Sequence, residues 1–355
     1  MNKSIEKGAK KMTKSIQKLL AVFATLLMVF SLAACGSSDK TGTSEGDSKG
    51  ETQVLKIAFN QTEQHPQYKA MVEFGKSFEE KTNGKYKVEI FPNELLGAQR
   101  ETVELVQSGT IAMSIVAGPL MENLNPDFAV FNLPYIFNSL DHQMSIINNP
   151  DIVSDLYASL EKERITVAAA LHGGVRNVYN SEKPIQKPED LKGMKIRIME
   201  SDTNVQMMER MGGTGTPMGQ GEVYTAIQSG VLEGGENNEL VFNDLKHVEI
   251  APYYSYTQHL MIPDYLIINA ELLAGMSEED QKVFKEELSK AVDSEVEMFN
   301  KEVERAKAEA EAAGAKFNEV DLKAFQQAVQ PLIDEKTSAN ENTKKLYEKI
   351  VENAQ

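Results

Sequence analysis

Two arginines on strand-like stretches are the residues of this chain whose chemistry is most specific. Arg197 lies in MKIRIM at residues 194–199, where Ile196 and Ile198 would share one face of a strand and Arg197 would point to the other. An arginine inside an otherwise apolar strand is costly unless a carboxylate or phosphate pairs with it. That partner is either an acidic residue of the chain or a bound ligand, and spacing leaves both open. Arg176, in GGVRNVY, presents the same choice.

The patterns of common catalytic and cofactor sites are missing from the sequence. It contains no Gly-x-Ser-x-Gly elbow, no His-Glu-x-x-His and no phosphate-binding loop ending in Gly-Lys-Ser/Thr. The glycine-rich residues 211–217 follow a predicted helix instead of a strand, and Pro217 lacks the N–H that a phosphate would bind. The five histidines show no i, i+4 spacing. We therefore expect no catalytic residue, no metal and no cofactor.

Composition and charge exclude further classes of protein. A chain of 355 residues can form two domains, because single cores rarely grow beyond about 250–300 residues. Its one cysteine excludes an internal disulfide and a cysteine-based zinc site. The formal net charge of −16 argues against nucleic acid as a partner. Beyond the N-terminus no apolar run reaches the ~18 residues that span a bilayer, so we expect a water-soluble, acidic body.

The N-terminus is typical of a targeting segment. Residues 1–34 combine a lysine-rich start with the apolar run 19–32, which predicts a signal peptide. The sequence LAAC that ends at Cys35 resembles a bacterial lipobox, which implies cleavage before Cys35 and lipid on its sulfur; a plain secretory signal with an incidental cysteine is the alternative. Residues 35–53 would then be a lipidated cysteine and a flexible tether. We expect the protein at the extracytoplasmic face of the cell membrane, periplasmic or on the cell surface.

Strand-like and helix-like segments alternate from residue 54 onward, which predicts an α/β fold with parallel strands. The predicted strands are residues 54–59, 86–90, 111–116, 165–171, 175–180 and 194–199, and the predicted helices are residues 66–82, 100–107 and 203–211. A further helical pattern begins after Ser277 and continues to Gly314, roughly 55 Å at 1.5 Å per residue. A helix of that length should lie across two domains. The polar residues 234–239 (GGENNE), taken alone, read as a tight turn.

Several motifs in order resemble the solute-binding proteins of tripartite ATP-independent (TRAP) transporters, over about residues 54–340. They are DFAVFNLPYIF at 127–137, LKGMKIRI at 191–198, TPM at 216–218, EVYTAIQSG at 222–230 and LEGGENN at 232–238. The resemblance implies an α/β, two-lobed periplasmic-binding-protein-like fold with a hinge and a long C-terminal helix spanning both lobes. Lobe 1 would comprise residues 54–173 plus about 262–302, and lobe 2 residues 174–261 plus about 303–355.

The resemblance also implies the site. Arg197 corresponds to the arginine that clamps a ligand carboxylate, with Arg176 and Asn237 beside it, and Asn60 contacts the ligand from the other lobe. His65 is a further polar candidate, although a histidine satisfied by local bonds explains it equally well. The remaining polar candidates are Gln220, Asn238, Tyr256 and His259. The implied partners are a small carboxylate ligand, the integral membrane subunits of the transporter, and the membrane through the lipid anchor.

Two departures from the family pattern bear on the ligand. Residues 219–221 (GQG) stand where many relatives carry an aromatic, and residues 234–236 (GGE) stand where Asp-Gly-Gln is common. A polar cleft suits several hydroxyls, so we expect a sugar acid such as a hexuronate or an aldonate. A C4-dicarboxylate or 2-oxo acid is the alternative ligand, while an extracellular carbohydrate-active enzyme or a purely structural lipoprotein are the alternatives from other classes.

The lipid anchor leads to a test. Cys35→Ala should release the protein from the membrane fraction, because the modified sulfur would be lost, while the purified soluble domain keeps its ligand affinity. Membrane and soluble fractions of cells that express both forms would be compared by immunoblot. A variant that still partitions into detergent like the parent would contradict the anchor.

Overall fold

The computed structural model describes residues 52–354. The predicted signal peptide, Cys35 and the tether as far as residue 51 lie outside the described residues. None of the helices between residues 52 and 354 combines the length and the apolar character that a bilayer crossing requires.

One sheet of mixed direction contains all the strands of the described residues. They are β1 (Gln53–Ala58), β2 (Tyr86–Phe91), β3 (Met113–Ala117), β4 (Ile165–Asn180), β5 (Lys195–Ile198), β6 (Thr214–Pro217), β7 (Gly234–Asn237), β8 (Tyr253–Asn269) and β9 (Lys316–Asn318). Their order across the sheet is β2-β1-β3-β8-β4-β7-β5-β6, and β9 pairs with β8.

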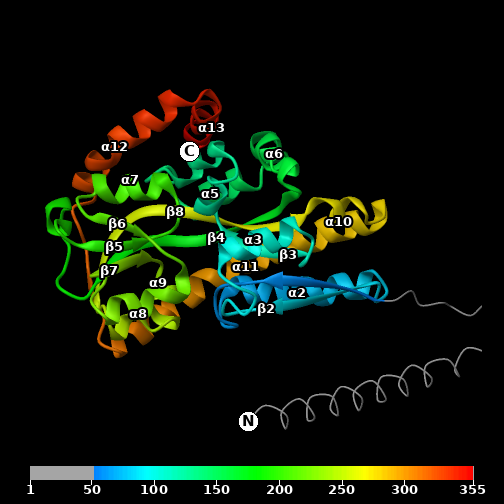
Figure 1. Cartoon of the computed structure of the whole chain (residues 1–355), viewed down its shortest axis with the longest axis horizontal. Helices are drawn as coiled ribbons and strands as arrows, with labels where there is room; N and C mark the ends of the chain where they lie inside the picture. Colours follow the sequence, from blue (N-terminus) through cyan, green and yellow to red (C-terminus); the bar gives the residue numbers. More distant parts are fainter. Residues whose placement is uncertain (1–51, 355) are drawn as a thin grey trace, which may run out of the picture. The chain divides into compact units, whose positions relative to one another are not determined.

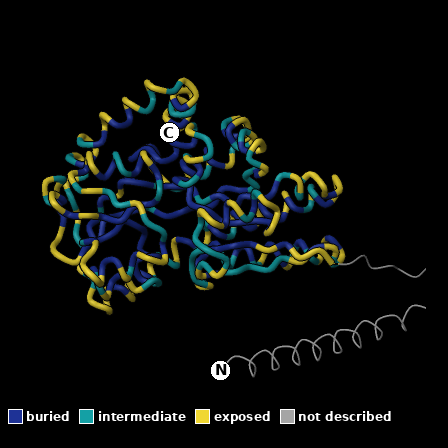
Figure 2. Tube along the Cα trace, in the orientation of Figure 1, coloured by how far each residue is buried: buried dark blue, intermediate teal, exposed yellow. Residues whose placement is uncertain are grey.

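Helices cover this sheet (Figure 1). The α-helices are α2 (Pro66–Lys81), α3 (Gln99–Gln107), α4 (Gly118–Met121), α5 (Leu140–Ile147), α6 (Pro150–Ala158), α7 (Asp202–Arg210), α8 (Val223–Gln228), α9 (Glu239–Asp244), α10 (Ala270–Ala274), α11 (Glu278–Ala312), α12 (Leu322–Ala339) and α13 (Glu341–Glu352). Short 3-10 helices are η1 (Pro126–Asn132), η2 (Glu161–Glu163), η3 (Pro188–Leu191), η4 (Gln220–Glu222) and η5 (His247–Glu249). The strands lie mostly in the buried part of the molecule, and exposed residues gather on the outer helices (Figure 2).

The α/β fold is as expected, but the prediction of a parallel sheet is wrong at its centre. β1 pairs in parallel with β2 and β3, and β5 pairs in parallel with β6 and β7. Between these groups, β3, β8, β4 and β7 pair antiparallel. β8 was not predicted from the sequence because most of its residues are buried. Such a strand lacks the apolar–polar alternation of a half-exposed strand.

The long strands β4 and β8 connect the two parallel groups. Segments 165–171 and 175–180, predicted as separate strands, form the single strand β4, whose pairing with β8 shifts between His172 and Val175. Gly173 and Gly174 occupy this shift: Gly174 has φ +82°, and a Cβ on Gly173 would lie 2.7 Å from the Ile262 carbonyl oxygen. The shift lies at the predicted lobe boundary, near residues 173 and 262, and the boundary itself stays a prediction.

The long helix predicted after Ser277 is confirmed as α11. The Ser277 hydroxyl accepts a hydrogen bond from the Asp280 amide and caps its first turn. Phe284 and its neighbours on α11 pack in one core with α2, whereas Phe299 packs with Leu240 of α9. The helix therefore braces elements that belong to both parallel groups.

Candidate functional site

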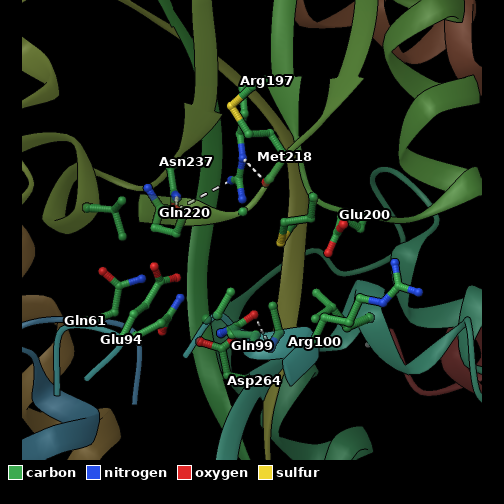
Figure 3. A pocket seen from close by; sticks show the side chains of 18 of the residues that line it. Gln61, Glu94, Gln99, Arg100, Arg197, Glu200, Met218, Gln220, Asn237 and Asp264 are labelled. Atoms are coloured by element: carbon green, nitrogen blue, oxygen red, sulfur yellow. Dashed lines mark hydrogen bonds between the residues drawn. The ribbon is translucent and has the colours of Figure 1, made fainter. Parts of the chain in front are cut away.

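A pocket opens where several parallel strands end. The space between its walls, about 600 Å³, is partly continuous with solvent. Its lining includes residues that directly follow β1, β2, β5, β6 and β7, as expected at the carboxyl ends of strands. In Figure 3, Arg197, Met218, Gln220 and Asn237 face Gln61, Glu94, Gln99 and Asp264 across this space. Seven predicted site residues line it: Asn60, His65, Arg176, Arg197, Gln220, Asn237 and Asn238.

Arg176 on β4 has its counter-charge inside the protein. Its Nη2 donates to Glu236 Oε1 at 2.8 Å, its Nε donates to the other oxygen of the same carboxylate, and its Nη1 donates to Asn237 Oδ1 at 2.9 Å. Burial acts to raise the pKa of Glu236, but Arg176 and His259 outweigh it and hold the pKa at about 2. For Arg176, the internal ion pair left open by the sequence is therefore the correct interpretation.

Arg197 on β5 has no such partner. Arg197 is only 5% exposed, and Ile196 and Ile198 anchor the opposite face of the strand in the core. Nε donates to the Met218 carbonyl at 2.9 Å and Nη1 lies 3.5 Å from Gln220 Oε1. No acidic side chain among residues 52–354 forms a salt bridge with it, and burial lowers the pKa of Arg197.

Two amide side chains extend this donor surface. Asn237 on β7 is 3% exposed, and its Nδ2 lies 3.4 Å from Gln220 Oε1. Gln220 Nε2 is buried and has no hydrogen-bond partner among the described residues. A buried donor without an acceptor is costly, so a ligand oxygen would satisfy it.

The reading of residues 234–239 as a tight turn is wrong. Gly234–Asn237 form the buried strand β7 between β4 and β5, and Asn238 caps α9 by accepting from the Val241 amide. The two glycines do not form a turn; they allow Tyr179 to pack closely against β7. A Cβ on Gly234 would lie 2.0 Å from the Tyr179 carbonyl oxygen, and one on Gly235 would lie 2.5 Å from the Tyr179 hydroxyl.

Of the three remaining candidates, His65 lines the pocket, whereas His259 and Tyr256 do not. His65 Nδ1 caps α2 by accepting a hydrogen bond from the backbone N–H of Gln67 at 3.3 Å. Its ring packs edge-on against Phe59 and Phe299. Burial lowers the pKa of His65 to about 3. His259 does not line the pocket, because it lies behind Glu236 with Nε2 3.4 Å from Glu236 Oε2. Tyr256 also lies outside the lining and stacks on Phe317.

Sequence reasoning missed several residues of the wall opposite Arg197. Its polar residues include Gln61 and Glu94, which follow β1 and β2, and Asp264 within β8. Burial raises the pKa of Asp264, whose Oδ2 accepts from Gln67 Nε2 at 2.8 Å. The rule that ligands bind at the carboxyl ends of parallel strands could have found the first two.

Known proteins share this fold and part of this sequence. The family model "Bacterial extracellular solute-binding protein, family 7" matches residues 57–340. The chain is 37% identical over 288 residues to the uncharacterized protein YiiZ of Salmonella typhimurium, covering 81% of this chain and 88% of that protein. It is similar to a TRAP periplasmic solute-binding protein from Anaerococcus prevotii solved with bound α/β-D-glucuronate, with TM-score 0.83, 36% identity, and coverage of 85% and 98%. A TRAP protein from Sulfitobacter with bound β-D-galacturonate gives TM-score 0.80, 31% identity, and coverage of 84% and 100%.

The buried pair of Arg176 and Glu236 leads to a stability prediction. Glu236→Gln should lower the free energy of unfolding by about 3–5 kcal/mol at neutral pH, because it leaves Arg176 buried without its counter-charge. The folded-state pKa lies below the ordinary 4.5, so this contribution is complete above pH 4.5 and is lost as the pH falls towards 2.

The matched control is Glu335→Gln, which breaks the exposed pair of Arg210 and Glu335 and should cost at most about 1 kcal/mol. Urea unfolding followed by circular dichroism at several pH values would compare the two variants. Equal losses at pH 7 would contradict a structural role for the buried pair.

Proposed function

The chain belongs to the bacterial extracellular solute-binding proteins of family 7, and from this premise we propose that it is the TRAP receptor for a sugar acid, with a hexuronate as the best-fitting ligand. The periplasmic-binding-protein-like fold and the recognition as a TRAP solute-binding protein are both confirmed by these comparisons. The relatives solved with glucuronate and galacturonate support the choice of a six-carbon sugar acid.

The observation that carries the proposal is the unpaired Arg197. A buried guanidinium held only by the Met218 carbonyl and a Gln220 amide needs a counter-charge, and a ligand carboxylate would supply it. Because the bond from Nε to Met218 fixes the plane of the group, the guanidinium is oriented before the ligand arrives. The unpartnered Gln220 Nε2 would donate to the same carboxylate.

The rest of the lining suits hydroxyl groups. The amide side chains of Asn60 and Gln61 offer both donors and acceptors, which match the mixed hydrogen bonding of a sugar. Asn237 Nδ2 adds a donor, because its Oδ1 already accepts from Arg176. Arg176 supports this surface by holding Asn237 through Nη1, and its own charge is already neutralised. Arg197 is therefore the buried guanidinium available to one ligand carboxylate, while Arg100 in the same lining is exposed to solvent.

The family is extracytoplasmic and works by binding, so we propose that the protein delivers its ligand unchanged to the TRAP membrane subunits. A lipid on Cys35 would keep the receptor near those subunits. Stoichiometric binding without turnover of a hexuronate would distinguish this receptor from a carbohydrate-active enzyme.

Substitution of Arg197 tests the carboxylate clamp. Arg197→Ala should weaken hexuronate binding by about 2–5 kcal/mol, roughly 30- to several-thousand-fold, because the ligand carboxylate would be buried without its partner. Arg197→Lys should rescue binding only in part, since an ammonium lacks two parallel N–H groups. Calorimetric titration with the acid and with its uncharged amide would measure both effects.

Arg210→Ala is the control, because Arg210 is exposed and paired with Glu335 far from the lining. It should bind like the parent. Near-normal binding of the acid by Arg197→Ala, or equal affinity of the parent for acid and amide, would overturn the clamp.

A further inference from the structure

Glu94 lies on the wall opposite Arg197, in the loop that follows β2 (Figure 3). Both Asn93 and Glu94 have φ +55°, a left-handed conformation that is uncommon for residues other than glycine. Such strain persists only where the surrounding structure imposes it, and it clusters at ligand-binding sites. The strained backbone at residues 93–94 therefore marks the place where Glu94 lines the pocket.

One carboxylate oxygen of Glu94 contacts the other wall. Its Oε2 would lie 2.5 Å from a Cβ placed on Gly221, so the loop after β6 approaches Glu94 as closely as it does because residue 221 has no side chain. Burial raises the pKa of Glu94, whereas the Gly221 amide and the Arg197 guanidinium act to lower it. These two groups therefore oppose the effect of burial on the carboxylate.

The second oxygen is left free. Glu94 Oε1 is buried and has no hydrogen-bond partner among the described residues. The pocket thus contains two unsatisfied groups of opposite kind: the Gln220 Nε2 donor beside Arg197, and the Glu94 Oε1 acceptor on the facing wall. An acceptor of this kind requires a donor on the ligand, and a sugar hydroxyl provides one.

We propose that Glu94 is a specificity-determining residue that accepts a hydrogen bond from a ligand hydroxyl and excludes ligands with a second carboxylate at that end. The inference rests on the proposed function and narrows the ligand class to polyhydroxy acids with one carboxylate. The Glu94 carboxylate would repel a second ligand carboxylate at this wall. Arg100, which lines the same wall, is exposed to solvent, where its attraction for an anion is screened. A C4-dicarboxylate fits this arrangement poorly.

Three ligands and two variants test the inference. The ligands are D-glucuronate, its dicarboxylate counterpart D-glucarate, and cyclohexanecarboxylate, which keeps a six-membered ring and one carboxylate but has no hydroxyl. Glu94→Gln keeps the size of the side chain and removes the charge. Glu94→Asn also tolerates the left-handed backbone and is too short to reach the ligand. Calorimetric titration gives each affinity, and thermal unfolding shows that each variant folds.

The parent should bind glucuronate more tightly than either other ligand by about 100-fold or more. Glu94→Asn should weaken glucuronate binding by about 10- to 100-fold, which is the loss of a hydrogen bond to a charged group. The same variant should leave the weak binding of cyclohexanecarboxylate unchanged. Glu94→Gln should reduce the preference for glucuronate over glucarate by at least tenfold, because the repulsion is removed.

The control is Leu95→Gln, a change in the same loop at a side chain that is 69% exposed and does not line the pocket. It should behave like the parent with all three ligands. A parent that binds neither glucuronate nor galacturonate would overturn the proposed hexuronate receptor and this inference with it. A parent that binds glucuronate while both Glu94 variants keep its ligand preferences would overturn this inference alone.

Discussion

A buried guanidinium without a counter-charge of its own is the constraint on which the site depends. Arg197 can occupy this position because Ile196 and Ile198 hold β5 in the core and a carbonyl oxygen orients the group. The empty state keeps a cation in a low-dielectric place, and that cost is recovered when an anion enters. The net charge of −16 repels anions at long range, so recognition must come from contacts shorter than the ~10 Å screening length at 0.1 M salt.

Two arginines of one sheet have different surroundings, and these surroundings predict different roles. Arg176 has the Glu236 carboxylate, which itself is fully buried, and becomes part of the fixed framework. Arg176 positions Asn237 by a hydrogen bond, and Glu236 contacts His259. Arg197 donates only to neutral acceptors, so its charge stays available to a ligand. A residue type on a strand therefore does not reveal its function until its neighbours are known.

The sequence predicted the parts of the fold that depend on local patterns. The alternation in MKIRIM identified β5 and the direction of Arg197, and the cap at Ser277 identified the start of α11. It could not predict β7, because its glycines make room for Tyr179, a residue far away in the sequence. The place of Glu94 after β2 could have singled it out among 53 acidic residues, but its left-handed backbone and the approach of Gly221 across the pocket could not be predicted from local sequence.

The shared strands β4 and β8 have a consequence for how this receptor can be modified. β8 pairs with β3 of one parallel group, β4 pairs with β7 of the other, and the two strands pair with each other. A fragment that contains one group alone would therefore expose a row of unpaired N–H and C=O groups. Such edges are templates for aggregation, and neither half is a module that could be transplanted or expressed by itself. The loops at the strand ends, residues 92–97 and 218–222, lie outside the strands, so they can vary without altering the pairing of the sheet.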